Sequence, residues 1–100
     1  MKRRFVLVTE PLTPEQERQI AAALPGPNIG WWHHLPNTWL IVDLSGAAIS
    51  AESLQGLLTG IAPAARMFVT EVSYGSPWTI RYSLSQPHEL QWVQDYWAAP

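Results

Sequence analysis

The chain contains no cysteine and few charged residues, and both shortages narrow the classes of protein to which it can belong. Without cysteine it has neither a disulfide framework nor thiolate chemistry, which is compatible with a reducing cytoplasm. Charged residues make up 14% of the chain, against about 25% in a typical globular domain. Because so few residues of this small domain are charged, we expect a partner to cover part of its surface.

The chain also lacks a long hydrophobic run and an excess of positive charge. Behind the basic start, residues 2–4, the apolar run lasts only from Phe5 to Val8, which is too short for a signal peptide or a membrane span. The formal net charge of −2 argues against strong binding to duplex nucleic acid, which needs a basic stripe. We therefore expect a cytoplasmic protein with no membrane segment and no cofactor.

What the chain has instead is a hydrophobic share of 47%, including six tryptophans. Because aromatic side chains bury large areas, 100 residues suffice for one domain, residues 1–100, made of one sheet and two or three helices. The first strand is predicted at Arg3 to Glu10. Its apolar residues point to both faces, which is typical of a central strand.

Two helix starts can be recognised from their caps. Thr13 and Gln16 have the spacing of a capping box, with a proline at the first helical position. Ser50 is the second cap, and Ile49 and Leu54 flank it at the positions of a hydrophobic staple. Each helix is predicted to run up to a following proline.

The remaining elements complete an alternating order. An aromatic hairpin, residues 30–43, lies between the two helices, and a strand from Arg66 to Tyr74 follows the second helix. The order strand, helix, strand, strand, helix, strand is that of a ferredoxin-like fold. We therefore predict an α+β two-layer sandwich over residues 3–74, with both helices on one face of the sheet.

The tail, residues 76–97, adds to this core. Its apolar residues first alternate with polar ones, which predicts a fifth strand with one buried face. The alternating residues are Trp78, Ile80, Tyr82 and Leu84. A proline at position 87 then opens a short helix, whose apolar stripe comprises Leu90, Val93 and Trp97. We expect the tail to be structural and to pack on the sheet.

The hairpin gathers three tryptophans and two histidines around a Pro-Asn turn. With a loop of two or four residues, His34 lies opposite Trp39, and Trp32 lies opposite Ile41. These four side chains then share one face. The other face, predicted to lie under the helices, carries Trp31, His33, Leu40, Val42 and Leu44. A loop of three residues would exchange the faces along one strand relative to the other.

Because a ferredoxin-like sheet has helices on one side only, the face with Trp32 and Trp39 would be bare. We predict that this face and the fifth strand together bind a second copy of the chain or another protein. The residues assigned to it are Trp32, His34, Trp39, Ile41, Trp78 and Tyr82.

No catalytic residue and no metal site is assigned from the sequence. Neighbouring residues of a strand point to opposite faces, so His33 and His34 cannot hold one ion between them. The candidate contacts to nucleic acid are Arg66 and Arg81, and they are few for a chain of negative net charge.

The segment from Gly30 to Val42, with the strand before it and the helix and strand after it, resembles the small bacterial proteins labelled SinR-like. The resemblance covers about residues 3–74, and its most specific element is W-W-H-x-L-x-x-T-W. It implies a distant relation to the CRISPR-associated ferredoxin-like endoribonucleases, which dimerise through their sheets. Those nucleases place a metal-binding Asp in a Tyr-Asp pair after the first strand, whereas this chain has Val8-Thr9-Glu10.

The sequence thus favours a non-catalytic homodimeric interaction module, with three alternatives left open. A nucleic-acid-binding relative would need Arg66, Arg81 and the amino-terminal basic residues to meet on the sheet. A weak metal-dependent nuclease would need Glu10 in place of the missing Asp. A partner-binding inhibitor or antitoxin-like protein would need only an apolar face and low charge.

Overall fold

The computed structural model describes residues 2–24, 27–73, 75–79 and 87–99. The elements of the first half are β1 (Arg3–Thr9), α1 (Pro14–Ala23), β2 (Ile29–Leu35) and β3 (Thr38–Asp43). They are followed by α2 (Ala51–Ile61), β4 (Met67–Val72) and α3 (Pro87–Trp92), which continues as a π-helix, η1 (Val93–Ala98). Up to β4 the elements therefore follow one another as strand, helix, strand, strand, helix and strand.

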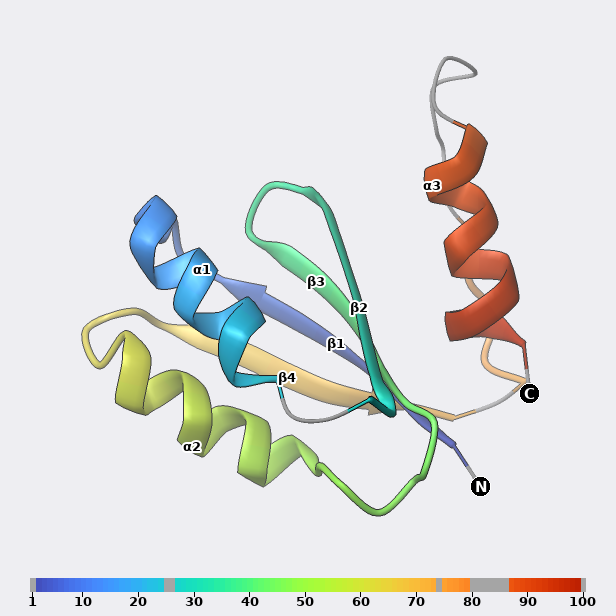
Figure 1. The fold of residues 1–100 in the computed structure, drawn as a ribbon, viewed down its shortest axis with the longest axis horizontal. Coiled ribbons are helices and arrows are strands. Elements are labelled where there is room, and N and C mark those ends of the chain that lie inside the picture. Colours follow the sequence, from blue (N-terminus) through green and yellow to red (C-terminus); the bar gives the residue numbers. More distant parts are fainter. Residues whose placement is uncertain (1, 25–26, 74, 80–86, 100) are drawn as a thin grey trace.

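The four strands form an antiparallel sheet in the order β2-β3-β1-β4. β1 lies between β3 and β4, as its two-sided apolar pattern predicts. The helices α1 and α2 lie side by side on one face of the sheet, and α3 stands apart from them beside β2 and β3 (Figure 1). The α+β class and the two layers of the core are thus as predicted.

Both predicted helix caps are present. The Thr13 hydroxyl accepts the Gln16 backbone N–H at 3.1 Å, and the Gln16 side chain accepts the Thr13 N–H at 3.0 Å. Ser50 and Ser53 form the equivalent pair at the start of α2. Such reciprocal bonds satisfy backbone donors that have no partner within the helix. Among the described helices, none is long and apolar enough to cross a membrane.

The main core lies between the sheet and the two helices. α1 contributes one buried isoleucine and α2 two buried leucines, which pack on the inner face of β1 and β3. The buried residues of this core are Phe5, Leu7, Ile20, Leu24, Trp39, Ile41, Ile49, Leu54 and Leu58. The staple residues Ile49 and Leu54 both belong to it, so the loop before α2 is anchored as expected.

The predicted register of the hairpin is wrong. Trp31 pairs with Ile41 and Trp32 with Leu40, and the register then shifts before Leu35 pairs with Thr38. The loop itself has the two residues predicted, and Asn37 adopts a left-handed φ of 62°. β2 therefore contains one extra residue, a β-bulge, and this bulge shifts all pairs on the far side of it by one position.

This shift exchanges the faces of the two hairpin strands relative to each other. Trp39 and Ile41, predicted to be on the bare face, lie under α1 and α2 and are 1% and 0% exposed. His33 stacks on Trp39 with ring centroids 4.0 Å apart, on that same side of the sheet. Trp32 and His34 point to the opposite side. The two neighbouring histidines therefore lie on opposite faces, as predicted.

A second, smaller core fills part of the other face. Here α3 and η1 pack on β2 and β3. The buried residues of this second core are Trp32, Val42, Val93 and Trp97. The tail therefore covers, within its own chain, half of the face that was expected to be bare.

The tail forms the predicted short helix from Pro87 onward, and this helix continues into η1. Of the segment predicted to form the fifth strand, residues 76–79 are described and do not form a strand. The remaining residues assigned to that strand, Ile80, Tyr82 and Leu84, lie outside the described residues, as does Arg81.

Candidate interaction face

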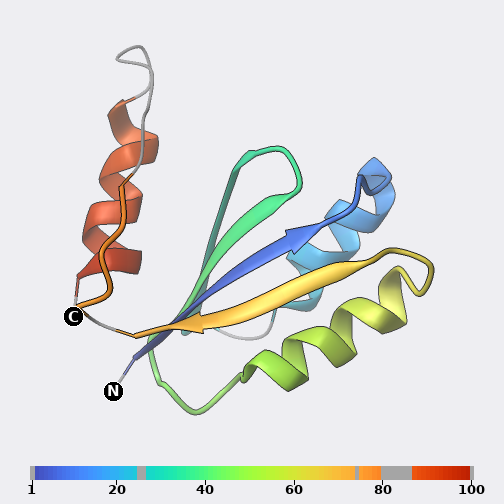
Figure 2. The ribbon, with the colours of Figure 1, turned by 180° about the vertical axis from the view of Figure 1, so that it is seen from behind.

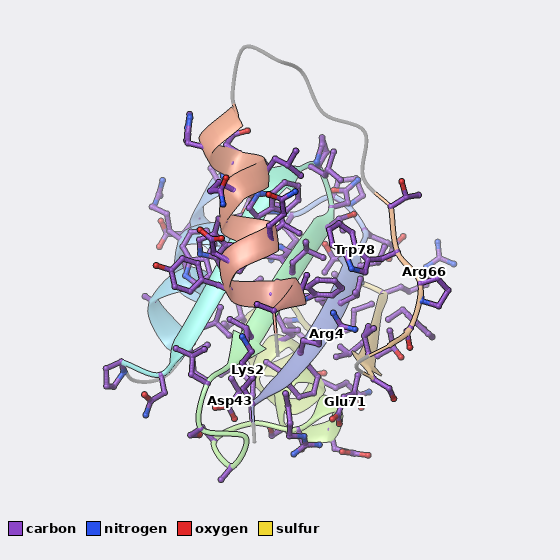
Figure 3. All side chains as sticks on the ribbon, turned by 90° about the vertical axis from the view of Figure 1, so that its right-hand side faces the viewer. Lys2, Arg4, Asp43, Arg66, Glu71 and Trp78 are labelled. Carbon is purple, nitrogen blue, oxygen red and sulfur yellow. The ribbon has the colours of Figure 1, made fainter. Side chains whose placement is uncertain are left out.

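The face of the sheet opposite α1 and α2, which we call the second face, is divided into a covered half and an open half. On the covered half α3 stands in front of the sheet (Figure 3). Trp32 Nε1 donates to the backbone oxygen of Glu89 at 3.0 Å, and Trp97 Nε1 donates to that of Phe5 at 3.2 Å. Gly30 leaves room for Trp92, because a Cβ there would lie 3.3 Å from the indole ring.

Arg4 is a buried cation between the sheet and η1. Its guanidinium donates to the backbone oxygens of Val72 at 3.2 Å and Ser73 at 2.7 Å. It also lies 4.8 Å from the ring centroid of Trp97. A cation over an indole face is attracted by the ring's quadrupole, so Arg4 joins the end of β4 to the tail.

His34 and Glu89 connect β2 to α3. His34 Nδ1 lies 2.9 Å from Glu89 Oε1. Glu89 is 8% exposed, and its other carboxylate oxygen is buried with no hydrogen-bond partner. A carboxylate beside a histidine also orients metal ligands and catalytic bases. Among the described residues, however, no three His, Asp or Glu side chains gather in one place.

We expect His34→Ala to lower the free energy of unfolding by roughly 1–2 kcal/mol, because it leaves the buried Glu89 carboxylate without its partner. Urea denaturation would measure the change. His88→Ala is the matched control, since His88 is exposed on the same helix. Equal stabilities of the two variants would show that the contact contributes nothing to the docking of α3.

The open half of the second face lies over β1 and β4. Figure 2 shows these two strands crossing the molecule with no helix over them. One row of paired residues begins on these two strands and continues across the ends of β3 and β2. We call it the open row, and its residues are Phe68, Val8, Thr38 and Leu35. Directly opposed residues of antiparallel strands share a face. Phe68 is 64% exposed, and Val8 and Leu35 are also exposed.

A cavity, which we call the tryptophan pocket, adjoins the Leu35 end of the open row. Its volume is about 150 Å³. It is lined by Trp32, Leu35, Leu40, Trp78, Thr79, Val93 and Trp97. The rings of Trp78 and Trp97 meet edge to face with centroids 6.2 Å apart. The pocket is therefore almost entirely apolar, with one side-chain hydroxyl.

The charged rim of the open half is neutralised by an ion pair. Arg66 is 2.9 Å from Glu10 through its guanidinium and 2.7 Å through its backbone N–H. The hydrogen bonds from Arg66 hold the pKa of Glu10 below its ordinary value, and the bond to Glu10 raises the pKa of Arg66. Glu10 is thus engaged by an arginine and is not a free metal ligand.

The other described arginines also have partners. Arg3 binds Glu71 at 2.5 Å, which lowers the pKa of that carboxyl, and Arg18 binds Glu15 on α1. Together with the buried Arg4, these pairs leave no cluster of unpaired arginines on the described surface. Within the described residues, Arg66 therefore lies in an ion pair and not in a basic patch.

The predicted face is only partly assembled. Trp32, His34 and Trp78 lie on the second face, whereas Trp39 and Ile41 are in the main core, and Tyr82 is outside the described residues. Sequence reasoning did not assign Phe68 to the exposed face.

The sequence signal for the position of Phe68 is the alternation of side chains along β4. It places Phe68 opposite to Met67 and Val69, but only the register of β4 with β1 shows that this side is the open one.

Comparison with protein-family models, with curated proteins and with solved structures finds no match for this chain. The function of the chain must therefore be inferred from the geometry of the second face.

Proposed function

We propose that this protein is a non-catalytic interaction module that forms a homodimer through the open half of its second face. The observation that carries the proposal is the open row, in which Phe68, Val8 and Leu35 expose apolar side chains along one line across the sheet, with Thr38 between the last two. Exposed apolar patches of this kind mark binding surfaces in proteins that are otherwise soluble.

The charge distribution supports a second copy as the partner. The open row contains no charged side chain, and Glu10 and Arg66, which line a surface pocket together with Val8 and Phe68, form an ion pair. In a two-fold interface the same surface patch of both subunits meets, so a patch with charge of one sign would repel its copy. An uncharged apolar face avoids this repulsion. A stable pair typically buries about 800 Å² on each subunit.

The assignment of the fold and of the family is part of the same proposal. We infer that the sandwich is ferredoxin-like and that the chain is a SinR-like relative of proteins that dimerise through their sheets. The alternating order of strands and helices and the sheet order β2-β3-β1-β4 support the ferredoxin-like part. The W-W-H-x-L-x-x-T-W segment supports the SinR-like part.

Phe68→Glu tests the homodimer. Two carboxylates would enter the apolar contact, so we expect the dimer dissociation constant to rise roughly 100-fold, at about 1–3 kcal/mol for each uncompensated group. Size-exclusion chromatography with light scattering at tens of micromolar would show a dimer for the unmodified chain and a monomer for the variant. Because Phe68 is mostly exposed, the melting temperature of the monomer should be little changed.

Leu44→Glu is the matched control, because Leu44 is exposed in the loop after β3 and outside the open row. It should leave the dimer intact. A monomeric unmodified chain, or equal weakening by both variants, would contradict the proposed face. Trp39→Glu would not test this face, because Trp39 is buried in the main core and a carboxylate there would unfold the chain.

A further inference from the structure

The tryptophan pocket has the size and chemistry to hold one aromatic ring. A cavity of about 150 Å³ lined by aliphatic and aromatic side chains takes up benzene in other proteins. Apart from Thr79, the described lining residues offer no polar side-chain group other than indole N–H groups, and those of Trp32 and Trp97 already donate to backbone oxygens. The ring that fits it best is therefore an unsubstituted hydrocarbon ring.

The walls of the pocket are fixed before any ring enters. The hydrogen bonds of Trp32 and Trp97 hold two walls, and Trp78 packs edge to face on Trp97. A site that is already ordered loses little conformational entropy on binding. Aromatic anchors in such pockets supply much of the binding energy of protein interfaces.

Phe68 is a ring of this kind in a suitable position. It is the most exposed large hydrophobic residue among those described. It lies in the same row, on the same face, as Leu35, which lines the pocket. Three strand spacings separate the two positions, roughly 14 Å, so Phe68 cannot reach the pocket of its own chain.

We propose that in the homodimer each copy inserts Phe68 into the tryptophan pocket of the other copy. The inference rests on the proposed homodimer and specifies its contact. One copy carries both the ring and the pocket, so a two-fold axis satisfies both contacts at once and closes the assembly at two chains. Val8 and Thr38, between the ring and the pocket, lie at the centre of the interface.

Disulfide trapping tests this contact, and the absence of natural cysteine makes every bond assignable. The double variant Phe68→Cys/Leu35→Cys should form a covalent dimer on mild oxidation at least tenfold faster than either single variant. A bond within one chain is excluded, because positions roughly 14 Å apart exceed the reach of a disulfide of about 7 Å. The double variant Phe68→Cys/Leu44→Cys is the matched control and should resemble the single variants.

The outcomes separate this inference from the homodimer itself. If Phe68→Cys alone cross-links as fast as the double variant, the Phe68 rings meet each other, and the pocket contact is overturned while the dimer face stands. If the unmodified chain is a dimer by light scattering but no variant cross-links, the contact is again overturned. A monomeric unmodified chain overturns both proposals.

Discussion

Replacing Trp97 by alanine is expected to lower the free energy of unfolding by about 3–5 kcal/mol, a large part of the roughly 5–15 kcal/mol available to a small domain. Trp97 is 4% exposed and packs with Trp32, Val42 and Val93 in the second core. The substitution also removes the hydrogen bond to Phe5 and the ring beneath Arg4. Chemical denaturation followed by circular dichroism would measure the loss.

Tyr96→Ala is the matched control, because Tyr96 is the neighbouring aromatic residue and is half exposed. Its stability should stay within about 1 kcal/mol of the unmodified chain. A truncation ending at Gly75 should be worse than Trp97→Ala, because it uncovers the whole second core. Should Trp97→Ala and Tyr96→Ala unfold at the same denaturant concentration, the docking of η1 on the sheet would be disproved.

The elements that sequence reasoning placed well are those governed by local physics. The caps at Thr13 and Ser50 depend on residues three positions apart, and the structure contains both. The central position of β1 agrees with its apolar residues on both faces, because Phe5 and Leu7 lie in the main core and Val6 packs against the second core. Such signals are complete within a few residues of the chain.

The face of each hairpin side chain could not be found in this way. A single extra residue in β2, between Trp32 and Leu35, decides whether Trp39 lies in the core or on the surface. The sequence of the turn is the same in either case. What selects the bulge is tertiary: Trp39 fills the space between the sheet and α1, while Trp32 meets α3. The residues assigned to the binding face were partly wrong for the same reason, because that assignment used the predicted register.

Asp43 is a further feature that the sequence did not reveal. It is fully buried at the end of β3 and organises the loop that leads into α2. One carboxylate oxygen accepts from the Ser45 hydroxyl at 2.6 Å and from the N–H groups of Ser45 and Gly46. The other accepts from the N–H groups of Ala48 and Ile49 at 2.7 and 3.1 Å. All the donors lie within six residues of the carboxylate, so the bonds fold the loop tightly around it.

These hydrogen bonds determine how Asp43 responds to acid. Burial by itself raises the pKa of the carboxyl, but the bonds from Ser45 and from the loop backbone outweigh it, so the pKa lies below the ordinary value of 3.8. A carboxyl with a lowered pKa in the folded state binds protons more readily when unfolded. Its stabilising contribution is therefore complete well above pH 3.8 and is lost as the pH falls through the folded-state pKa.

We expect Asp43→Asn to lower the free energy of unfolding by roughly 2–3 kcal/mol at neutral pH, because the amide nitrogen cannot accept the loop N–H bonds that a carboxylate oxygen accepts. The difference from the unmodified chain should shrink as the pH falls below about 4, where the native carboxyl also becomes protonated. Urea denaturation from pH 7 to pH 2.5 would follow both effects. Asp95→Asn, an exposed change on η1, should cost less than about 0.5 kcal/mol at every pH. A constant gap between Asp43→Asn and the unmodified chain down to pH 2.5 would show that the loop is held by packing and not by the charged carboxylate.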